Sequence, residues 1–505
     1  MDVNKENEQN DNKSEVIKRE NPLRLEKKKK LSQLKEVGVN CYPHEFAVKD
    51  HSIKIKNAHD HIAAGDKLND VKVVIAGRVM TKRDMGKASF FNIQDSLGQI
   101  QVYIKLSEIS EEQAKAFKLV DIGDIVGVEG FVFKTQKGEL SVHAESFAML
   151  CKTVEPLPEK YHGLTDVELK YRYRHLDLIM NPETKRVFKV RSKIISEIRK
   201  YLDERGFLEV ETPVLQPIYG GASAYPFATH HRALDMKLFM KISPELYLKR
   251  LIVGGFDKVY EIGKNFRNEG IDRSHNPEFT MLEFYEAYTD YKYQMQQFEE
   301  LIETVCKHVT GGTKVNYQGQ EIDFKTPWKR LTVKQAIMDY GQFDVDDLSE
   351  DELFAKIKEL GSSLEKPSSR GEMTLEAFEL CAEHHLMQPT FVIDHPVEVS
   401  PLTKDHRSQP GLVERFEPFC AGMEIGNAYS ELNDPEEQRR RLEVQEAKRV
   451  VDEEAQPMDE DFLHAIDVGM PPTGGVGIGI ERIVMILTDQ PSIRDILFFP
   501  TMKHK

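Results

Sequence analysis

Three glycines at alternate positions, followed by a glutamate and an arginine, constrain the fold of this chain more than any other feature. They lie in Gly475-Val-Gly-Ile-Gly-Ile-Glu481-Arg482. Glycine at every second position leaves one face of a strand bare, so its backbone can approach a ligand closely. A dinucleotide-binding loop needs a glycine where Ile480 stands, and the sequence contains no GxxxxGK[ST] phosphate loop. The pattern therefore predicts a strand that contacts a ligand, with Arg482 at the start of a following helix.

Length and charge limit the classes of protein to consider. A chain of 505 residues with 40% hydrophobic content predicts two or three domains with sizeable cores. A net charge of −15 argues against indiscriminate nucleic-acid binding, although a local basic surface remains compatible with it. The five scattered cysteines form no CxxC pair, so neither a zinc ribbon nor a disulfide framework is expected. No secretory signal or membrane span is expected either, and the predicted location is the cytoplasm.

The amino-terminal part divides into a tail, a helical segment and a barrel. Residues 1–22 are polar and are predicted to be disordered. Residues 23–65 contain a lysine-rich stretch that predicts a basic helix, which is either a solvated face or a source of general RNA affinity. Residues 66–155 predict an OB-fold barrel of five antiparallel strands with one inserted helix at Glu111 to Leu119. The predicted strands are Val71–Gly77, Phe90–Asp95, Ile100–Ile104, Ile125–Gly130 and Glu139–Ala144.

Residues 156–505 form the largest predicted domain. A helix from Val187 to Leu202 precedes a strand from Phe207 to Thr212, and Pro213 after that strand suits the edge of a sheet. Residues 311–383 contain no chemical motif and are predicted to be a mostly helical insertion.

A second motif has residue types that suit a nucleotide. It runs Phe266-Arg267-Asn268-Glu269 and continues after a gap with His275-Asn276-Pro277-Glu278-Phe279. The arginine can bridge two oxyanions, the glutamate can accept from an exocyclic amine, and the phenylalanine can stack on a base. Alone, an Arg-x-Glu on a strand is more often a surface ion pair.

Three segments in order resemble the motifs of the class II aminoacyl-tRNA synthetases: Arg205–Leu215, Phe266–Phe279 and Gly475–Arg482. The segment Asn427–Pro435 is similar to the lysyl enzymes in particular. The resemblance implies an α+β fold in which helices flank an antiparallel catalytic sheet, and a homodimer formed through the first segment. It also implies a lysine–tRNA ligase, which joins L-lysine to AMP from ATP and then passes it to tRNA(Lys).

The same resemblance implies an ATP site. Arg267 and Arg482 would be the catalytic groups, because they compensate the charge of the pentavalent transition state. Glu417 and Glu424 would bind Mg²⁺, a hard cation that prefers carboxylate and phosphate oxygens. The implied ATP-binding residues are Arg267, Glu269, His275, Asn276, Phe279, Glu417 and Arg482.

A lysine site and an anticodon site complete the resemblance. Glu431 would neutralise the substrate's ε-ammonium, which needs an opposing carboxylate in a closed pocket. The implied lysine-binding residues are Gly221, Glu245, Glu283, Tyr285, Asn427, Tyr429 and Glu431. Strict alternation puts Glu424 on the opposite face from Asn427, so a shared pocket predicts a β-bulge near Gly426. The implied anticodon-binding residues are Phe90, Gln101 and Glu139, with Phe91 in the barrel core.

Two alternatives remain open from the sequence. One is a sister enzyme of the same subclass that takes aspartate or asparagine. The other is a non-catalytic RNA-binding or signalling paralogue, against which the presence of Arg267, Glu269, Glu417, Glu424 and Arg482 argues.

Overall fold

The computed structural model describes residues 21–158, 166–365, 367–449 and 456–503. Nearly all of the predicted disordered tail therefore lies outside the described residues. The chain separates into two compact units that divide after Gly163, and each is considered by itself. Within the described residues, every helix is too short or too polar to cross a lipid bilayer.

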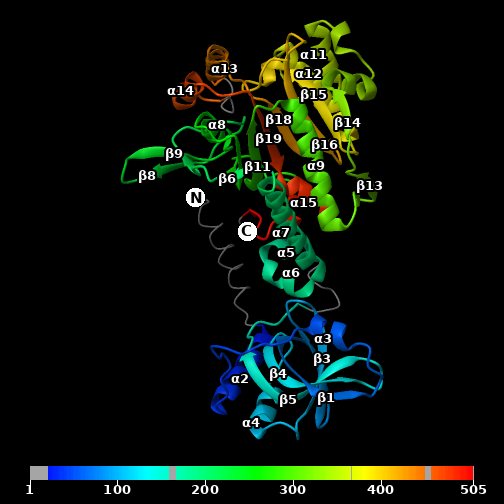
Figure 1. Cartoon of the computed structure of the whole chain (residues 1–505). Helices are drawn as coiled ribbons and strands as arrows, with labels where there is room; N and C mark the ends of the chain where they lie inside the picture. The colour runs from blue at the N-terminus through cyan, green and yellow to red at the C-terminus, as the bar shows by residue number, and fades with distance from the viewer. Residues whose placement is uncertain (1–20, 159–165, 366, 450–455, 504–505) are drawn as a thin grey trace, which may run out of the picture. The chain divides into compact units, whose positions relative to one another are not determined.

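The first unit is the predicted five-stranded barrel (Figure 1). Its strands are β1 (Lys67–Met85), β2 (Ala88–Gln94), β3 (Gln99–Lys105), β4 (Ile125–Lys134) and β5 (Leu140–Cys151). They close in the order β1-β2-β3-β5-β4, and β3 pairs with β5 in parallel. That pairing corrects the all-antiparallel prediction. A closed ring with an odd number of strands cannot alternate direction throughout, so at least one neighbouring pair must be parallel.

Three helices accompany the barrel: α2 (Pro22–Glu36), α3 (Ser52–His59) and α4 (Glu111–Lys118). The predicted basic helix is α2, and part of its charge is used within the protein. Lys27 Nζ donates to Ile122 O and Thr153 Oγ1, each at 2.9 Å, and Lys30 Nζ lies 2.6 Å from Asp121 Oδ1. Two of the lysines thus attach the helix to the barrel.

The second unit is built on a large sheet with strand order β14-β15-β16-β18-β19-β11-β10-β6, with β17 (Met423–Glu424) paired to β16. The other strands are β6 (Leu208–Glu209), β10 (Lys258–Phe266), β11 (Glu278–Ala287), β14 (Lys329–Thr332), β15 (Thr390–Pro396), β16 (Leu412–Cys420), β18 (Gly426–Ser430) and β19 (Thr473–Gly479). The centre is antiparallel as predicted, but β14–β15 and β10–β6 are parallel pairs. The short strand β6 lies at the edge of the sheet, where the following proline was expected to place it.

Helices α7 (Pro182–Asp203), α9 (Tyr291–Thr310) and α15 (Ile480–Thr488) pack together against the sheet (Figure 1). Ile194, Phe298 and Val484 from these helices are fully buried in one core with Phe284 of β11. The remaining helices around the sheet are α5 (Val167–Arg172), α6 (Arg174–Met180), α8 (Glu245–Val253), α13 (Pro435–Lys448) and α14 (Glu460–Val468). Burying these apolar stripes holds the central strands rigidly, so their other face is free to carry a site.

Residues 311–383 are helical only from Val333 onward, which corrects the prediction of a mostly helical segment. The segment begins with the hairpin β12 (Lys314–Tyr317) and β13 (Gln320–Asp323), which precedes β14. Helices α10 (Val333–Ala336), α11 (Glu350–Glu359) and α12 (Arg370–Cys381) follow and have an apolar core of their own. A further small sheet comprises β7 (Leu215–Gln216), β8 (Ala228–His231) and β9 (Met236–Met240).

Candidate functional site

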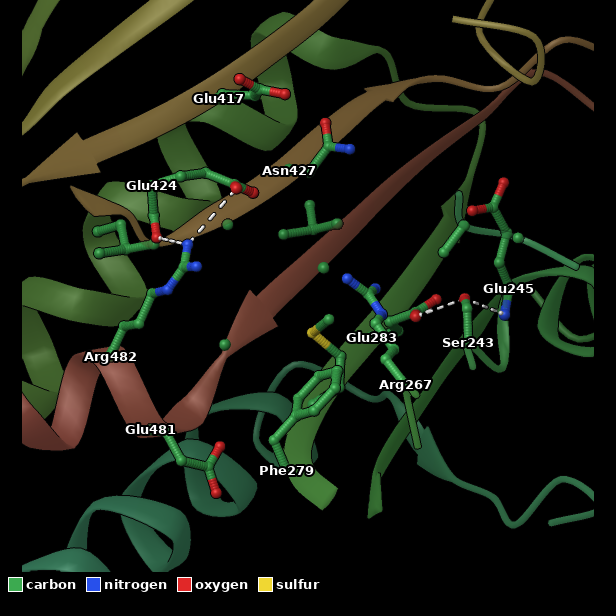
Figure 2. Close-up of a pocket in the computed structure, with 18 of the residues that line it drawn as sticks. Ser243, Glu245, Arg267, Phe279, Glu283, Glu417, Glu424, Asn427, Glu481 and Arg482 are labelled. Carbon is green, nitrogen blue, oxygen red and sulfur yellow. Dashed lines mark hydrogen bonds and ion pairs between the residues drawn. The ribbon is translucent and has the colours of Figure 1, made fainter. Parts of the chain in front are cut away.

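A cavity of about 450 Å³ lies over the central strands of the large sheet (Figure 2). Strands β11, β16, β18 and β19 all contribute to its walls, and Arg267, which follows β10, contributes as well. Every residue that the sequence suggested for ATP, metal or lysine lines this cavity except Glu431. These residues are Gly221, Glu245, Arg267, Glu269, His275, Asn276, Phe279, Glu283, Tyr285, Glu417, Glu424, Asn427, Tyr429 and Arg482.

The guanidinium of Arg267 has a donor available to bind an anion. Arg267 follows the last residue of β10 and is half-buried, and its buried Nε has no hydrogen-bond partner among the described residues. Its guanidinium lies 5.2 Å from the centroid of the Phe279 ring on β11, and both face the cavity in Figure 2. Burial lowers the pKa of Arg267, although Glu269 opposes this effect. A half-buried cation with an unused donor is a suitable place for a phosphate or carboxylate oxygen.

Glu481 and Arg482 open helix α15, as the glycine motif predicted. Arg482 Nη1 donates to the backbone oxygen of Glu424 and lies 3.4 Å from its Oε2. Glu481 faces the other way and accepts from Arg191 Nη2 at 2.8 Å and from the Thr280 amide at 2.9 Å. Glu481 therefore ties α7 to β11, whereas Arg482 stays at the cavity wall.

The predicted bulge is confirmed by the pairing register. Phe419 pairs with Glu424, and Phe416 pairs with Ala428, so three residues of one strand oppose two of the other. Because of this extra residue, Glu424 and Asn427 both reach the cavity.

Glu417 and Glu424 meet the requirements of a hard cation. Arg415 Nη2 donates to Glu417 Oε1 at 2.6 Å, and Arg415 Nε donates to Asn427 Oδ1 at 3.0 Å, which fixes both side chains. Burial raises the pKa of Glu424, and the nearby negative charge of Glu417 raises it further. Mg²⁺ is commonly held by one or two carboxylates together with phosphate oxygens, so this pair of carboxylates fits it.

The opposite end of the cavity is closed and rich in carboxylates. Ser243 Oγ donates to Glu283 Oε1 at 2.8 Å, and Tyr285 Oη donates to Glu283 Oε2 at 3.0 Å. Tyr429 Oη donates to Glu245 Oε1 at 2.7 Å. Burial and the charge of Glu245 raise the pKa of Glu283 to about 8. Carboxylates crowded together in this way are suited to a cationic ligand.

Glu431 lies beneath this closed end rather than in the cavity lining. It is 1% exposed, and its carboxylate forms an ion pair with the fully buried Lys249. Glu431 Oε1 has no hydrogen-bond partner in the described parts of the chain. An added Cβ at Gly475 would lie 2.0 Å from this oxygen and 2.5 Å from Tyr285 Cε1. The first glycine of the motif therefore makes room for the groups at the closed end.

Two residues at the rim already have partners within the protein. His275 Nδ1 lies 2.8 Å from Asp272 Oδ2, and its ring is exposed. Asn276 Nδ2 donates to Glu278 O at 2.6 Å, and its Oδ1 accepts from the Thr501 amide at 3.3 Å. Asn276 thus fixes the backbone beside Phe279.

The barrel unit carries an aromatic surface of its own. Phe90 of β2 lies on the outer face, with its ring centroid 4.9 Å from that of Tyr103, whereas Phe91 is 1% exposed in the core, as predicted. Gln101 of β3 is half-buried and accepts from Ser141 Oγ at 2.9 Å. Glu139 is exposed and immediately precedes β5.

Sequence reasoning missed Lys249 and Arg415, which fix the carboxylates and the amide of the site. A signal for Lys249 was present, because Glu245 and Lys249 are four residues apart on α8 and such pairs meet on a helix face. No comparable signal pointed to Arg415, whose partners lie on its own and a neighbouring strand.

Comparison with known proteins agrees with this geometry. Residues 166–503 match the family model described as tRNA synthetases class II (D, K and N), and residues 73–150 match that of the OB-fold nucleic acid binding domain. The chain is 51% identical over 492 residues to the lysine–tRNA ligase of Moorella thermoacetica, covering 97% of this chain and 99% of that protein. It is 53% identical over 477 residues to the lysine–tRNA ligase of Methanoculleus marisnigri, covering 94% of each.

Proposed function

The chain belongs to the class II tRNA synthetases and, within them, to the lysine–tRNA ligases, and on that basis we propose that it attaches L-lysine to tRNA(Lys). In the first step the lysine carboxylate attacks the α-phosphorus of ATP, forming lysyl-adenylate and releasing pyrophosphate. In the second step a hydroxyl of the terminal tRNA ribose attacks the carbonyl carbon, and AMP leaves. The observation that carries the choice of lysine is the carboxylate-rich closed end of the cavity.

Charge compensation is the main contribution of the protein to the first step. The attacking carboxylate and the α-phosphate repel each other, and the guanidinium of Arg267, which lines the cavity, would attract both. Arg482, at the cavity wall, would bind the triphosphate. Phe279 would stack on the adenine, and Glu269 would accept a hydrogen bond from its amine. No protein nucleophile is needed, because both attacking groups belong to substrates. The cavity acts by holding them in line.

Glu417 and Glu424 are the residues that would hold Mg²⁺ in this proposal. The cation would neutralise phosphate charge and favour departure of pyrophosphate. Arg415 supports the arrangement, because it holds Glu417 in place from the protein side.

Lysine would be selected by its ε-ammonium, because aspartate and asparagine carry an α-ammonium as well. Glu245 and Tyr429 would take the α-ammonium, with the backbone at Gly221 beside them. Glu283, Tyr285 and the more deeply placed Glu431 would compensate the ε-ammonium. An aspartate or asparagine side chain brings no positive charge, so it would leave these carboxylates unpaired and costly to bury.

The barrel would read the anticodon. Phe90 offers a half-buried ring on the outer face on which a base would stack, and Gln101 and Glu139 offer polar groups for its edge. In this proposal the barrel contributes choice of tRNA and the large sheet contributes chemistry.

A cytoplasmic homodimer completes the proposal. The edge strand β6 and its neighbourhood present Leu208, Val214 and Leu215, each more than 40% exposed, as an apolar surface for a second copy. Sedimentation of the purified protein would give twice the chain mass if the dimer forms.

Amino-acid-dependent ATP–pyrophosphate exchange tests the proposed function. Lysine should support exchange, and aspartate and asparagine should not. Exchange with aspartate or asparagine alone would identify a sister enzyme. Absence of exchange with every amino acid, with and without tRNA, would favour a non-catalytic RNA-binding protein.

A further inference from the structure

Lys249 is a buried cation at the base of the cavity to which the reaction assigns no role. It lies on α8, has no exposed surface, and does not line the cavity. Its Nζ is 2.6 Å from Glu245 Oε1 and forms an ion pair with Glu431. The rings of Tyr429 and Phe462 lie 5.5 and 5.8 Å from the same nitrogen, so water is largely excluded.

Three carboxylates lie around Lys249 at the closed end, and Glu261 and Arg267 interact electrostatically with one of them, Glu283, from outside the cluster. Glu245 belongs to α8, Glu283 belongs to β11, and Glu431 follows β18. The three carboxylates and one ammonium leave an excess of two negative charges when all are ionised. Tyr285 and Tyr429 add hydroxyl groups without charge, because burial raises the pKa of both well above its ordinary value.

Lys249 determines how readily these carboxylates ionise. Burial alone would lower the pKa of Lys249, but Glu245 and Glu431 outweigh it, so the pKa is raised and the ammonium persists. Burial and Glu245 raise the pKa of Glu431, and Lys249 opposes that rise. Removing the ammonium would therefore favour protonated, neutral forms of the carboxyls that face the substrate.

We propose that Lys249 is a specificity-determining positioning residue, whose resident ammonium holds Glu245 and Glu431 as carboxylates and leaves the closed end with a net negative charge at pH 7. The ammonium of the lysine side chain compensates that charge, and a neutral side chain does not. This inference rests on the proposed lysine-activating function and deepens it. Lys249 acts through its two partners and touches no reacting atom.

The variant Lys249→Gln tests the inference, because glutamine can still hydrogen-bond to both carboxylates but has no charge. At pH 7 the KM for lysine in pyrophosphate exchange should rise at least about tenfold. This is the effect expected when the pKa of one carboxyl group in the lysine site rises by one unit. The kcat should change little. As pH rises from 6.5 to 8.5 the variant should recover more than the wild type, since the extra protons leave the carboxyls.

Two further variants separate charge from packing. Lys249→Arg keeps the charge and should retain the wild-type pH profile, with a KM within about threefold of wild type. Lys152→Gln is the matched control, because Lys152 is equally buried and pairs with Asp121 at 2.5 Å and Asp124 at 2.8 Å in the barrel unit. Its loss should leave the KM for lysine unchanged.

Clear outcomes would overturn the inference. A wild-type KM and pH profile in Lys249→Gln, or an equal rise in KM in Lys152→Gln, would show that the charge of Lys249 does not set lysine binding. If Lys249→Gln does not fold, Lys249→Arg decides: loss of lysine binding there, in folded protein, contradicts the proposal. Failure of the wild-type protein to activate lysine would instead refute the proposed function.

Discussion

The substitution Gly475→Ala tests whether the bare face of β19 makes room for the lysine-selecting groups. The added Cβ would lie 2.0 Å from Glu431 Oε1 and 2.5 Å from Tyr285 Cε1. Non-bonded carbon atoms normally stay about 3.5 Å or more from their neighbours, so Glu431 must withdraw by about 1.5 Å and Tyr285 by about 1 Å. The backbone at Gly475 lies outside the left-handed region, so the effect is one of space and not of backbone strain.

The expected size of the effect follows from that displacement. A shift of about 1 Å in a positioning group costs about 100-fold in rate, which corresponds to roughly 2.7 kcal/mol of transition-state stabilisation. Overpacking a buried site also costs about 1–3 kcal/mol of folding stability. We therefore expect kcat/KM for lysine to fall about 100-fold in Gly475→Ala, with a modest fall in Tm.

Pyrophosphate exchange at varied lysine and a thermal melt measure these quantities. Gly312→Ala is the control for an added methyl group, because Gly312 lies outside the cavity lining, its backbone is outside the left-handed region, and the methyl group would meet no atom within 4 Å. The control should keep the wild-type Tm and KM for lysine. Wild-type kcat/KM for lysine in folded Gly475→Ala, or an equal loss in both variants, would refute the reasoning.

Four other substitutions test separate parts of the account. Arg267→Ala should lower adenylate formation by about 100- to 1000-fold with little change in Tm, and retained activity would remove Arg267 from its role. The pKa of the Glu283 carboxyl is raised from 4.5 to about 8, so the folded state holds a proton that the unfolded state has lost between these values, and stability falls as pH rises through this window. Glu283→Gln abolishes that loss, so its Tm relative to wild type should be higher at pH 8 than at pH 5, and a difference independent of pH would contradict this. Phe90→Ala should weaken tRNA binding by about 1–3 kcal/mol without loss of stability. Phe91→Ala should cost about 3–5 kcal/mol of stability, and reversed effects in these two melts would refute the assigned faces.

The sequence was most informative where the pattern was local. Alternate glycines before Glu481 predicted a strand with one bare face followed by a helix, and the structure confirms this order in β19, which lines the cavity, and α15. The bulge beside Gly426 was predictable because two polar residues on opposite strand faces were assigned to one pocket. Phe90 and Phe91 were assigned to opposite faces on the same period-2 argument.

Pairings between distant segments were less predictable. The parallel pairing of β3 with β5 arises because a closed barrel of five strands needs at least one parallel pair. The alternation of residues within single strands does not reveal that the barrel closes. The hairpin around Gln318-Gly319 lay in a segment predicted to be mostly helical, although both residues adopt the left-handed conformation of a tight turn. Lys249 was missed because burial of a helical ion pair depends on what packs over it, here Tyr429 and Phe462.

The central claim is that buried carboxylates choose the substrate by compensating its side-chain charge. The most direct measurement is the ratio of kcat/KM for lysine to that for norleucine, a neutral analogue of the same chain length, in wild type and Glu431→Gln. The account predicts that the ratio falls at least about 100-fold in the variant, because an unpaired ammonium at the closed end is expensive to bury. An unchanged ratio would contradict the claim.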